Sequence, residues 1–340
     1  MTTIFNAATH FFSSKPTQAT FLCTNFCNSR CNWCNSWKLD SPNELTLEEI
    51  DKIFSNLYNF GIRMIYLSGG EPLLRKDIIS IIDTLSKKGF EIILTTNGLL
   101  LNEKNVRKLI KYKNLHINVS LDTLDKELYK KIRGVDALDL VLRNLKGLKR
   151  MYPDYPLRTT MTVSKINYKE VDKIIEFCKK NKIYFSANPY FWGGTYREGE
   201  DKFAYPNKRE EIKQIFSMLA KRVKKEKYIS GFSFVYAEVN KWVNGNYNTL
   251  CDAGTRFLWV GPTGDVAACQ DLNPFANLRK DNLNEEWKKY TWEKPVEACC
   301  KYQPCFIYCT RTVGMLRNNK LKFVKEVLNL KRLINYFRMY

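Results

Sequence analysis

The chain has 340 residues, 44% of them apolar and 14% aromatic, which is enough for a sizeable hydrophobic core and excludes a disordered protein. Its net charge of +20 indicates an anionic partner (a nucleic acid, an anionic membrane, an acidic substrate or an acidic electron donor), unless it reflects only a lysine-rich composition. With His10 and His116 as its two histidines, neither a histidine-rich metal site nor a Ser–His or Cys–His catalytic pair is expected.

The N-terminal residues 1–18 lack the basic start and the long apolar core of a signal peptide. No stretch of the sequence reaches the roughly 18–20 apolar residues that span a bilayer. We therefore expect a cytoplasmic protein, in a compartment that keeps thiols reduced. Eleven cysteines in such a compartment indicate ligands of a metal or a cluster in preference to disulfides.

Short runs of branched and aromatic residues alternate with helical patterns along most of the chain. The strand candidates are residues 19–23, 63–68, 90–96, 115–121, 158–163 and 183–190. A capping box of Thr46 and Glu49 begins one helix, and Asn167 with Glu170 begins another. Strands that alternate with helices favour a parallel α/β sheet, here a curved and incompletely closed barrel whose chemistry lies at the C-terminal ends of the strands.

The composition changes after a helix predicted at about 207–226. Residues 251–309 hold six of the eleven cysteines among Gly, Pro, Asn and Asp, which predicts a small appended domain held by metal. The last segment, 317–340, has seven Lys or Arg against one Glu, with its apolar residues on one helical face. Such a helix packs on its own domain or, as a second expectation, makes a peripheral contact with anionic lipid.

Three cysteines, Cys27, Cys31 and Cys34, follow the first predicted strand within eight residues. A structural zinc site needs four ligands, usually from two C-x2-C-like pairs. Three thiolates on a four-iron cluster instead leave one iron open, as a catalytic metal centre requires. We expect Cys23 in a strand and Cys178 on the apolar side of a helix to be buried, because free cysteines behave as small hydrophobes.

Polar and glycine-rich segments follow the next three predicted strands. SGGEP (68–72) comes directly after the second strand, and its glycines allow a tight turn and a close approach of the backbone to a ligand. TTNG (95–98) ends the third strand, SLD (120–122) ends the fourth, and KIRG (131–134) follows. Because the C-terminal ends of parallel strands meet at one edge, we expect these segments to meet the three cysteines there.

In this order the motifs resemble the signature of radical S-adenosylmethionine (SAM) enzymes, over roughly residues 18–230. The resemblance implies a 4Fe–4S cluster on Cys27, Cys31 and Cys34, whose open iron binds the amino and carboxylate groups of SAM. Arg133 would suit that carboxylate, since its planar fork pairs with both oxygens. The residues that the resemblance places at SAM are Trp33, Gly69, Gly70, Glu71, Asn97, Ser120, Asp122 and Arg133.

The later cysteines extend the resemblance. Cys251, Gly264 and Cys269 give C-x12-G-x4-C, which resembles the start of the SPASM or twitch domain found in one branch of that family. The match is incomplete, since one cysteine of the usual C-x2-C pair is missing and six cysteines remain where a full SPASM domain has seven. We therefore expect one auxiliary 4Fe–4S cluster, with a zinc ribbon as the alternative. Its predicted ligands are Cys251, Cys269 and Cys309, together with Cys305 or one of Cys299 and Cys300.

These features predict a partial (β/α)6 barrel over 18–230, a small cysteine-rich iron–sulfur domain over 245–312 and a basic amphipathic helix over 313–340. The resemblance implies that an electron from the cluster cleaves SAM to a 5′-deoxyadenosyl radical, which abstracts a hydrogen atom from the substrate. An acidic ferredoxin or flavodoxin suits the basic surface as electron donor.

Peptide or protein modification is the first expectation for the substrate, by its frequency in the family. Radical dehydrogenation or modification of a small alcohol, a sugar or a lipid is the alternative. Two hypotheses lie outside the family. A nucleic-acid-binding zinc protein would explain the charge and the cysteines, although we expect no nucleic-acid partner. A passive electron-transfer protein would not need the SGGEP and SLD segments.

Overall fold

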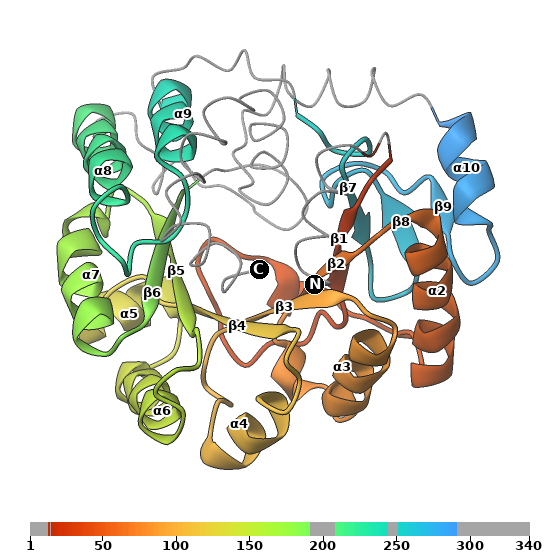
Figure 1. Ribbon diagram of the computed structural model, residues 1–340, viewed down its shortest axis with the longest axis horizontal. Helices are drawn as coiled ribbons and strands as arrows, with labels where there is room; N and C mark the ends of the chain where they lie inside the picture. The colour runs from red at the N-terminus through yellow and green to blue at the C-terminus, as the bar shows by residue number, and fades with distance from the viewer. Residues whose placement is uncertain (1–12, 14, 191–207, 244–250, 291–340) are drawn as a thin grey trace.

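The computed structural model of the chain describes residues 13, 15–190, 208–243 and 251–290. In these residues a curved sheet runs in the order β6-β5-β4-β3-β2-β1-β7-β8-β9, and helices lie along its outer side (Figure 1). The strands are β1 Gln18–Leu22, β2 Met64–Ser68, β3 Glu91–Thr96, β4 Leu115–Ser120, β5 Arg158–Val163, β6 Tyr184–Pro189, β7 Phe257–Val260, β8 Asp265–Ala267 and β9 Ala276–Asn277. The helices are α2 Leu47–Phe60, α3 Ile78–Lys87, α4 Glu103–Leu109, α5 Lys126–Arg133, α6 Leu138–Met151, α7 Val171–Lys180, α8 Arg209–Arg222, α9 Ser233–Val243 and α10 Leu283–Lys289, with 3-10 turns η1 Ser36–Lys38, η2 Pro72–Leu74 and η3 Tyr168–Glu170.

Strands β1 to β6 are parallel, and each pairs with the next along the chain. Their bounds lie within one residue of the six strands predicted from the sequence. Every connection between them contains a helix, and Figure 1 shows α2, α3, α4, α6 and α7 around the outside of the curved sheet. The predicted α/β partial barrel is therefore confirmed.

The two faces of the sheet differ in chemistry. On the outer face Ile65, Leu94 and Val119 are fully buried in the core that the helices share. At the alternate positions, which face the barrel interior, the strand register aligns polar side chains across β3 to β6. This polar inner face consists of Thr95, Asn118, Ser120, Arg158, Thr160 and Ser186. A barrel interior that served only as a packed core would carry branched apolar residues there, so this one suits a polar ligand.

The described part of the cysteine-rich segment extends the same sheet. β7 pairs in parallel with β1, and β8 and β9 continue the sheet in antiparallel fashion. At this edge Leu22, Phe257, Trp259 and Ala267 form an apolar cluster. The sequence predicts an appended domain over 245–312, yet the apolar run 257–260 forms a seventh parallel strand of the barrel. The division into three domains stays a prediction.

The helix starts were predicted with mixed success. The capping box is confirmed, since the hydroxyl of Thr46 accepts from the amide of Glu49 and the Glu49 carboxylate accepts from the amide of Thr46. Asn167 stands where the predicted helix begins, as the N-cap of η3, which leads directly into α7, but its side chain makes no capping hydrogen bond. Its side-chain amide donates to the carbonyls of Asp122 (3.1 Å) and Thr162 (2.8 Å), near the ends of β4 and β5.

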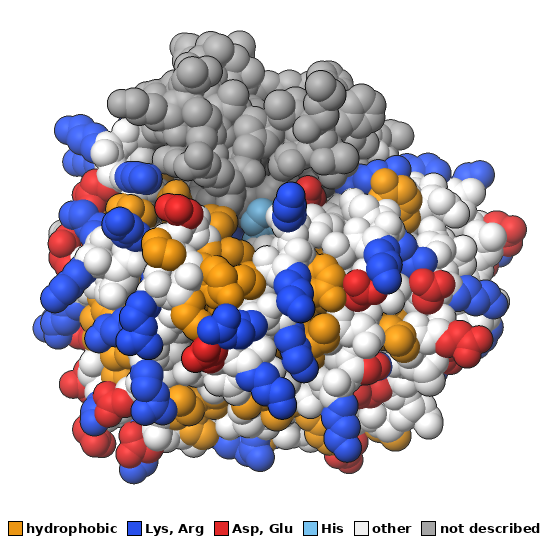
Figure 2. All heavy atoms as spheres, turned by 60° about the horizontal axis from the view of Figure 1, so that its bottom comes forward, with side chains coloured by type: hydrophobic (Ala, Val, Ile, Leu, Met, Phe, Trp, Pro, Cys, Tyr) orange, Lys and Arg blue, Asp and Glu red, His pale blue; other side chains and the backbone are white. Residues whose placement is uncertain are grey.

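The surface carries charges of both signs. On the face shown in Figure 2, Lys and Arg side chains are spread over the described residues with Asp and Glu between them. None of the helices in the described segments combines the length and the apolar character that crossing a bilayer requires. The predicted basic helix over 313–340 lies outside the described residues.

Candidate active site

The cysteine loop, which we define as residues 23–35, follows β1 and is held against the end of β2. The backbone amide of Gly70 donates to the carbonyl of Thr24 at 2.7 Å, and that of Glu71 donates to the carbonyl of Phe26 at 2.8 Å. These bonds pair backbone groups that the two turns would otherwise leave unsatisfied. The turn after β2 therefore fixes the course of the cysteine loop.

Gly69 and Gly70 are required by the closeness of this contact. A Cβ atom on Gly69 would lie 2.3 Å from the carbonyl oxygen of Thr24, and one on Gly70 would lie 2.3 Å from those of Asn25 and Phe26. Gly69 also has a φ of +145°, which residues with a side chain rarely adopt. The sequence predicts that these glycines approach SAM. Among the described residues, the group that they approach is the backbone of the cysteine loop.

The C-terminal end of α5 supports the cysteine loop from the other side. The last carbonyls of a helix have no partner within it, and those of Ile132 and Arg133 accept from the amides of Asn32 (3.0 Å) and Arg30 (2.9 Å). Gly134 ends the helix in the left-handed conformation, with φ +67°, and a Cβ there would lie 2.3 Å from the Arg30 carbonyl oxygen. The helix end and its glycine are thus a second backbone contact for the loop.

The thiols of Cys27, Cys31 and Cys34 are partly buried and lie within one another's electrostatic reach. Burial raises the pKa of Cys27, and the amide of Ser29, which donates to its sulfur at 3.4 Å, opposes the rise. Burial also raises the pKa of Cys31 to about 11, against the charge of Arg133. A bound cluster displaces the thiol protons, because its cationic iron stabilises the thiolates in place of the water that burial removes. Three partly buried thiols in one short loop, two of them with N–H donors on sulfur, suit the ligands of an iron–sulfur cluster, which is wider than a single ion.

A buried ion pair lies beside Cys31. Arg133 pairs with the fully buried Asp122 and donates through Nη1 to the sulfur of Cys31 at 3.8 Å. The amide of Thr162 donates to the other carboxylate oxygen at 2.8 Å. Burial raises the pKa of Asp122, and the charge of Arg133 opposes this rise. Burial lowers the pKa of Arg133, but the charges of Asp122 and Cys31 outweigh this effect and raise the pKa above its usual value. The contacts of Asp122 and Arg133 with SAM stay a prediction.

Glu71 links the ends of β2 and β3. Its side chain is fully buried, and Oε1 accepts from the hydroxyl of Thr96 at 2.7 Å and from the amide of Leu73 at 3.1 Å. Oε2 accepts from the amide of Asn97 at 2.7 Å. Burial raises the pKa of Glu71, and the hydrogen bonds from Asn97 and Thr96 oppose the rise. Both oxygens are thus engaged in holding two turns together, and the predicted contact of Glu71 with SAM stays a prediction.

Asn97 connects the end of β3 with the cysteine loop. Its amide nitrogen donates to Oδ1 of Asn28 at 2.7 Å and to the hydroxyl of Ser29 at 3.2 Å, and its oxygen accepts from the amide of Leu99. Asn28 and Ser29 are residues of the candidate site that were not predicted from the sequence. Their polar character between two cysteines was the feature of the sequence that could have indicated them. Their partner, Asn97, is known only from the fold.

Trp33 and Ser120 complete the predicted set. Trp33 is buried, and its ring packs against that of Tyr190, just after β6, with centroids 5.8 Å apart. Ser120 ends β4 on the polar inner face, opposite Thr160. The predicted residues after β1, β2, β3 and β4 therefore meet at one edge of the sheet, as the parallel fold requires.

Behind this edge the polar inner face forms a hydrogen-bond network. Oδ1 of Asn118 accepts from the hydroxyl of Thr160 at 2.7 Å and from Nε of Arg158 at 3.3 Å. The hydroxyls of Thr160 and Ser186 lie 2.7 Å apart. Further along β6, Oδ1 of Asn188 is buried and has no hydrogen-bond partner among the described residues. A buried acceptor of this kind is suited to a donor from a ligand.

The described members of the predicted auxiliary set lie together. Cys269 is buried in a small apolar cluster with Ala253 and Ala268, and Cys251 packs against the same cluster. In the described part of the chain, no three Cys, His, Asp or Glu side chains converge closely enough to hold a single metal ion. The other predicted ligands, Cys300, Cys305 and Cys309, and the alternative Cys299 lie outside the described residues.

Cys23 and Cys178 were predicted to be buried, and this is confirmed. Both side chains are fully buried, Cys23 directly after β1 and Cys178 on α7. Burial raises the pKa of both thiols, that of Cys178 to about 12, so neither thiol ionises at neutral pH.

Replacing Cys31 by serine is expected to reduce the iron content by about four atoms per chain, because a hydroxyl does not replace a thiolate as ligand of a cubane cluster. Replacing the buried Cys23 by serine is the matched control. It is expected to lower the free energy of unfolding by about 1–3 kcal/mol through an added buried hydroxyl, with the iron content unchanged. Iron and sulfide counts on anaerobically reconstituted protein check both, and equal iron loss in the two variants would contradict the assignment.

Residues 21–178 match the model of the radical SAM superfamily. A probable GTP 3′,8-cyclase of Methanocaldococcus jannaschii is 40% identical over 160 residues, which are 46% of this chain and 53% of that protein, so the match spans about half of that relative. A probable GTP 3′,8-cyclase of Sulfurisphaera tokodaii is 34% identical over 302 residues, which are 84% of this chain and 92% of that protein.

Solved structures share the fold. Streptococcus suis SuiB bound to S-adenosylmethionine has a TM-score of 0.68 at 18% identity, covering 88% of this chain and 71% of that one. Native anSMEcpe with bound AdoMet has a TM-score of 0.60 at 16% identity, covering 94% of this chain and 99% of that one. At these identities the likeness supports the fold alone. Because one relative is 34% identical over nearly its whole length, and because the family model covers the cysteine loop and the ends of β1 to β5, the chain is an iron–sulfur enzyme of the radical SAM superfamily.

Proposed function

We propose that this enzyme abstracts a hydrogen atom from a peptide or protein substrate held against the polar inner face. Membership of the family implies SAM and a 4Fe–4S cluster, and when bound the cluster supplies the electron that cleaves SAM. Cys27, Cys31 and Cys34 would hold that cluster at the edge where β1 to β4 end. The observation that carries the substrate proposal is the hydrogen-bonding, nearly uncharged chemistry of the polar inner face.

The charge of this face favours a substrate that forms hydrogen bonds over one with many negative charges. On β3 to β6 the polar inner face offers hydroxyls, an amide and one guanidinium, that of Arg158. Glu91 and His116, at the starts of β3 and β4, pair with each other at 3.3 Å. The buried oxygen of Asn188, without a partner among the described residues, matches the N–H of a peptide group.

The ion pair of Asp122 and Arg133 serves the cluster site. Its guanidinium donates to the sulfur of Cys31, and a cation beside a cluster ligand favours the reduced, more negative state. Asp122 keeps this guanidinium in place, since it is fully buried and held by the amide of Thr162. We assign Arg133 as a residue that raises the reduction potential of the cluster.

Cyclisation of GTP is a second candidate, favoured by the names of the relatives from Methanocaldococcus jannaschii and Sulfurisphaera tokodaii. A triphosphate needs several cations or a bound metal, and among the described residues Arg158 is the one cation of the polar inner face. This charge argument places GTP second. No observation in the described residues favours a small alcohol, a sugar or a lipid.

One experiment separates the two candidates. Reconstituted enzyme with SAM and dithionite is supplied either with GTP or with the peptide fraction of a cell lysate, and the release of 5′-deoxyadenosine is measured. We expect the peptide fraction to increase the release, and pretreatment of that fraction with a protease to abolish the increase. If GTP increases the release and is consumed in proportion, the peptide proposal fails and the second candidate stands.

A second 4Fe–4S cluster is part of the proposal, as in the SPASM or twitch branch of the family. Its support is the shared packing of Cys251 and Cys269 at the end of the extended sheet. Replacing Cys269 by serine is expected to lower the iron content from about eight to about four atoms per chain. The remaining cluster should still cleave SAM without substrate. Loss of all iron, or of none, would contradict a separate auxiliary cluster on this residue.

The electron donor that we propose is an acidic ferredoxin or flavodoxin in the cytoplasm. Its support is the net charge of +20, which favours association with an acidic protein. Such association weakens as salt screens the charges.

A peripheral membrane contact through residues 313–340 stays a prediction.

A further inference from the structure

A cavity of about 550 Å³ opens where β5 and β6 begin, at the opposite end of the strands from the cysteine loop. Its lining combines Lys149, Lys182 and Lys227 with Tyr155, Tyr184 and Tyr228, and Asp154 is the one carboxylate in it. A six-residue strand separates the two ends of the sheet by roughly 20 Å. The cavity is therefore a different place from the site at the cysteine loop.

The lysines of this cavity are not neutralised by carboxylates. Lys182 and Lys227 form no ion pair or side-chain hydrogen bond with any other described residue. Lys149 donates to the carbonyl of Tyr155 at 2.7 Å, and burial lowers its pKa; Asp154 opposes this, whereas Lys182 and Lys227 lower the pKa further. The ammonium groups of Lys182 and Lys227 thus repel that of Lys149, and Asp154 is the one carboxylate of the cavity lining.

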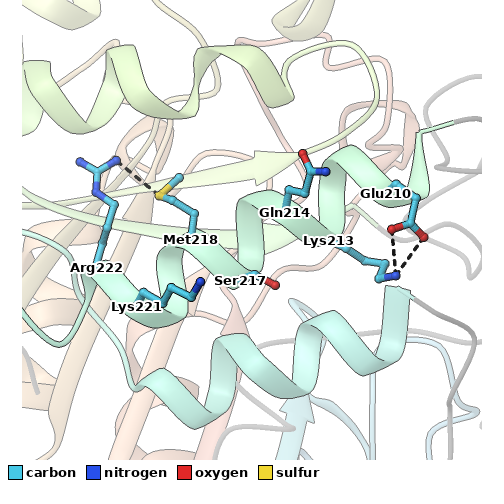
Figure 3. A pocket seen from close by; sticks show the side chains of 7 residues that line it. All are labelled: Glu210, Lys213, Gln214, Ser217, Met218, Lys221 and Arg222. Atoms are coloured by element: carbon cyan, nitrogen blue, oxygen red, sulfur yellow. Dashed lines mark hydrogen bonds and ion pairs between the residues drawn. The ribbon is translucent and has the colours of Figure 1, made fainter.

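A groove along α8, of about 490 Å³, shows the contrasting case (Figure 3). There Lys213 pairs with Glu210 at 2.9 Å, and Arg222 pairs with Glu226 and Asp172. Lys213 and Arg222 thus have their anions within the protein, whereas Lys221, the third basic side chain of that groove, forms no ion pair with a described residue. In the cavity at β5 and β6, Lys182 and Lys227 have no such carboxylate partners, so their charges suit an anionic ligand.

The backbone at Lys182 is a second, independent observation. Lys182 has a φ of +55°, the left-handed region that favours glycine. It lies two residues after α7 and two before β6, and at the same place between α3 and β3 stands Gly89, with φ +87°. Glycine would occupy this turn without strain. The presence of a lysine there instead indicates that its ammonium group has a function.

Tyrosine rings form a wall beside the lysines. The rings of Tyr184 and Tyr228 pack at 5.6 Å between centroids and 51° between planes, and Nζ of Lys227 lies 5.3 Å from the centroid of Tyr228. The hydroxyl of Tyr155 is fixed between strand groups, since it donates to the carbonyl of Leu115 at 2.8 Å. Fixed aromatic rings next to ammonium groups suit a ligand with both a planar ring and negative charge.

We propose that this cavity binds a small organic anion with a planar ring, of the nucleoside diphosphate class. Lys182 and Lys227 would pair with the phosphates, and the ring would pack on Tyr184 and Tyr228. The volume lies within the range of about 300–1,000 Å³ that is usual for ligand pockets. This second site goes beyond the proposed function, and it is independent of which substrate the radical site takes.

Isothermal titration calorimetry of the full-length reconstituted enzyme with uridine diphosphate tests the site. This probe carries neither the adenine of SAM nor the guanine of GTP, so it does not report on the radical site. We expect saturable binding at one site, an affinity that falls with salt, weaker binding of pyrophosphate and none of uridine. Absence of saturable binding, or equal binding of uridine, would overturn the proposal.

The decisive variant is Lys182→Gly, because it removes the ammonium group and also relieves the strained backbone. We expect at least about tenfold weaker binding of uridine diphosphate, with a melting temperature equal to or above that of the unchanged protein. Lys213→Gln in the α8 groove is the control and should bind normally. Unchanged affinity in Lys182→Gly would overturn the assignment. Cleavage of SAM should be the same in all three proteins, so failure here is distinct from failure of the proposed function.

Discussion

Replacing Gly70 by alanine is expected to lower the free energy of unfolding by about 3 kcal/mol or more and to prevent stable binding of the cluster. The added Cβ would lie 2.3 Å from the carbonyl oxygens of both Asn25 and Phe26. Neither oxygen can give way without moving the backbone of the cysteine loop. Moving it would also break the hydrogen bond from Gly70 to Thr24.

The matched control for this variant is Gly147→Ala in α6. A Cβ at Gly147 would have no atom within 4 Å, so there alanine should stabilise the helix by up to about 1 kcal/mol. Urea unfolding of the apoprotein and iron counts after reconstitution measure both effects. If Gly70→Ala kept its stability and its iron, the close approach of the two turns would be refuted.

Replacing Arg133 by methionine should destabilise the protein by about 3–5 kcal/mol, because it leaves the carboxylate of Asp122 buried without a counter-charge. The double variant with Asp122→Asn should recover much of this loss, since the added amide is neutral and can still accept from Thr162. The exposed pair of Arg107 and Glu103 is the control, and Arg107→Met should have no measurable effect on stability. Equal losses in the single and double variants would contradict a buried ion pair.

The pH dependence of Arg133→Met follows from the same pair. Burial raises the pKa of Asp122, and the guanidinium opposes this, so its removal raises the pKa further. The folded variant then binds a proton that the unfolded chain, with its ordinary aspartate pKa near 4, does not bind. Its stability should therefore rise as the pH falls from neutral through the raised pKa toward 4. Urea unfolding of the apoprotein at several pH values measures this, and a deficit independent of pH would refute it.

Arg133 also affects the cluster in a way that stability does not report. Without a guanidinium beside the sulfur of Cys31, the reduced cluster loses a stabilising charge. We expect a more negative midpoint potential in Arg133→Met that still holds its iron. Electron paramagnetic resonance during a redox titration measures the midpoint potential. In Arg133→Lys, which keeps a positive charge, the potential should lie closer to that of the unchanged protein.

Much of the fold and part of the site could be predicted from local patterns. The predicted bounds of six strands lie within one residue of the observed bounds. The branched and aromatic runs that indicate a strand depend only on neighbouring residues, so they can be recognised in the sequence. The seventh parallel strand was missed, since 257–260 lies among cysteines and turn residues and pairs with β1 from far along the chain. The helix start at Asn167 was predicted correctly, but the partners of its side-chain amide were not, because they lie at the ends of two strands and not in its own helix.

Sequence patterns alone were enough to assign the family and to predict that the motifs gather at the strand ends. The open-site arrangement of Cys27, Cys31 and Cys34 stays a prediction. Motif spacing and strand order are local properties, and parallel strands bring their ends together in any such fold. The contacts of each residue, such as that of Glu71 with Asn97, became known from the folded structure. Hydrogen bonds, buried charges and close backbone approaches depend on distances between residues remote in the chain, and a linear pattern does not contain those distances.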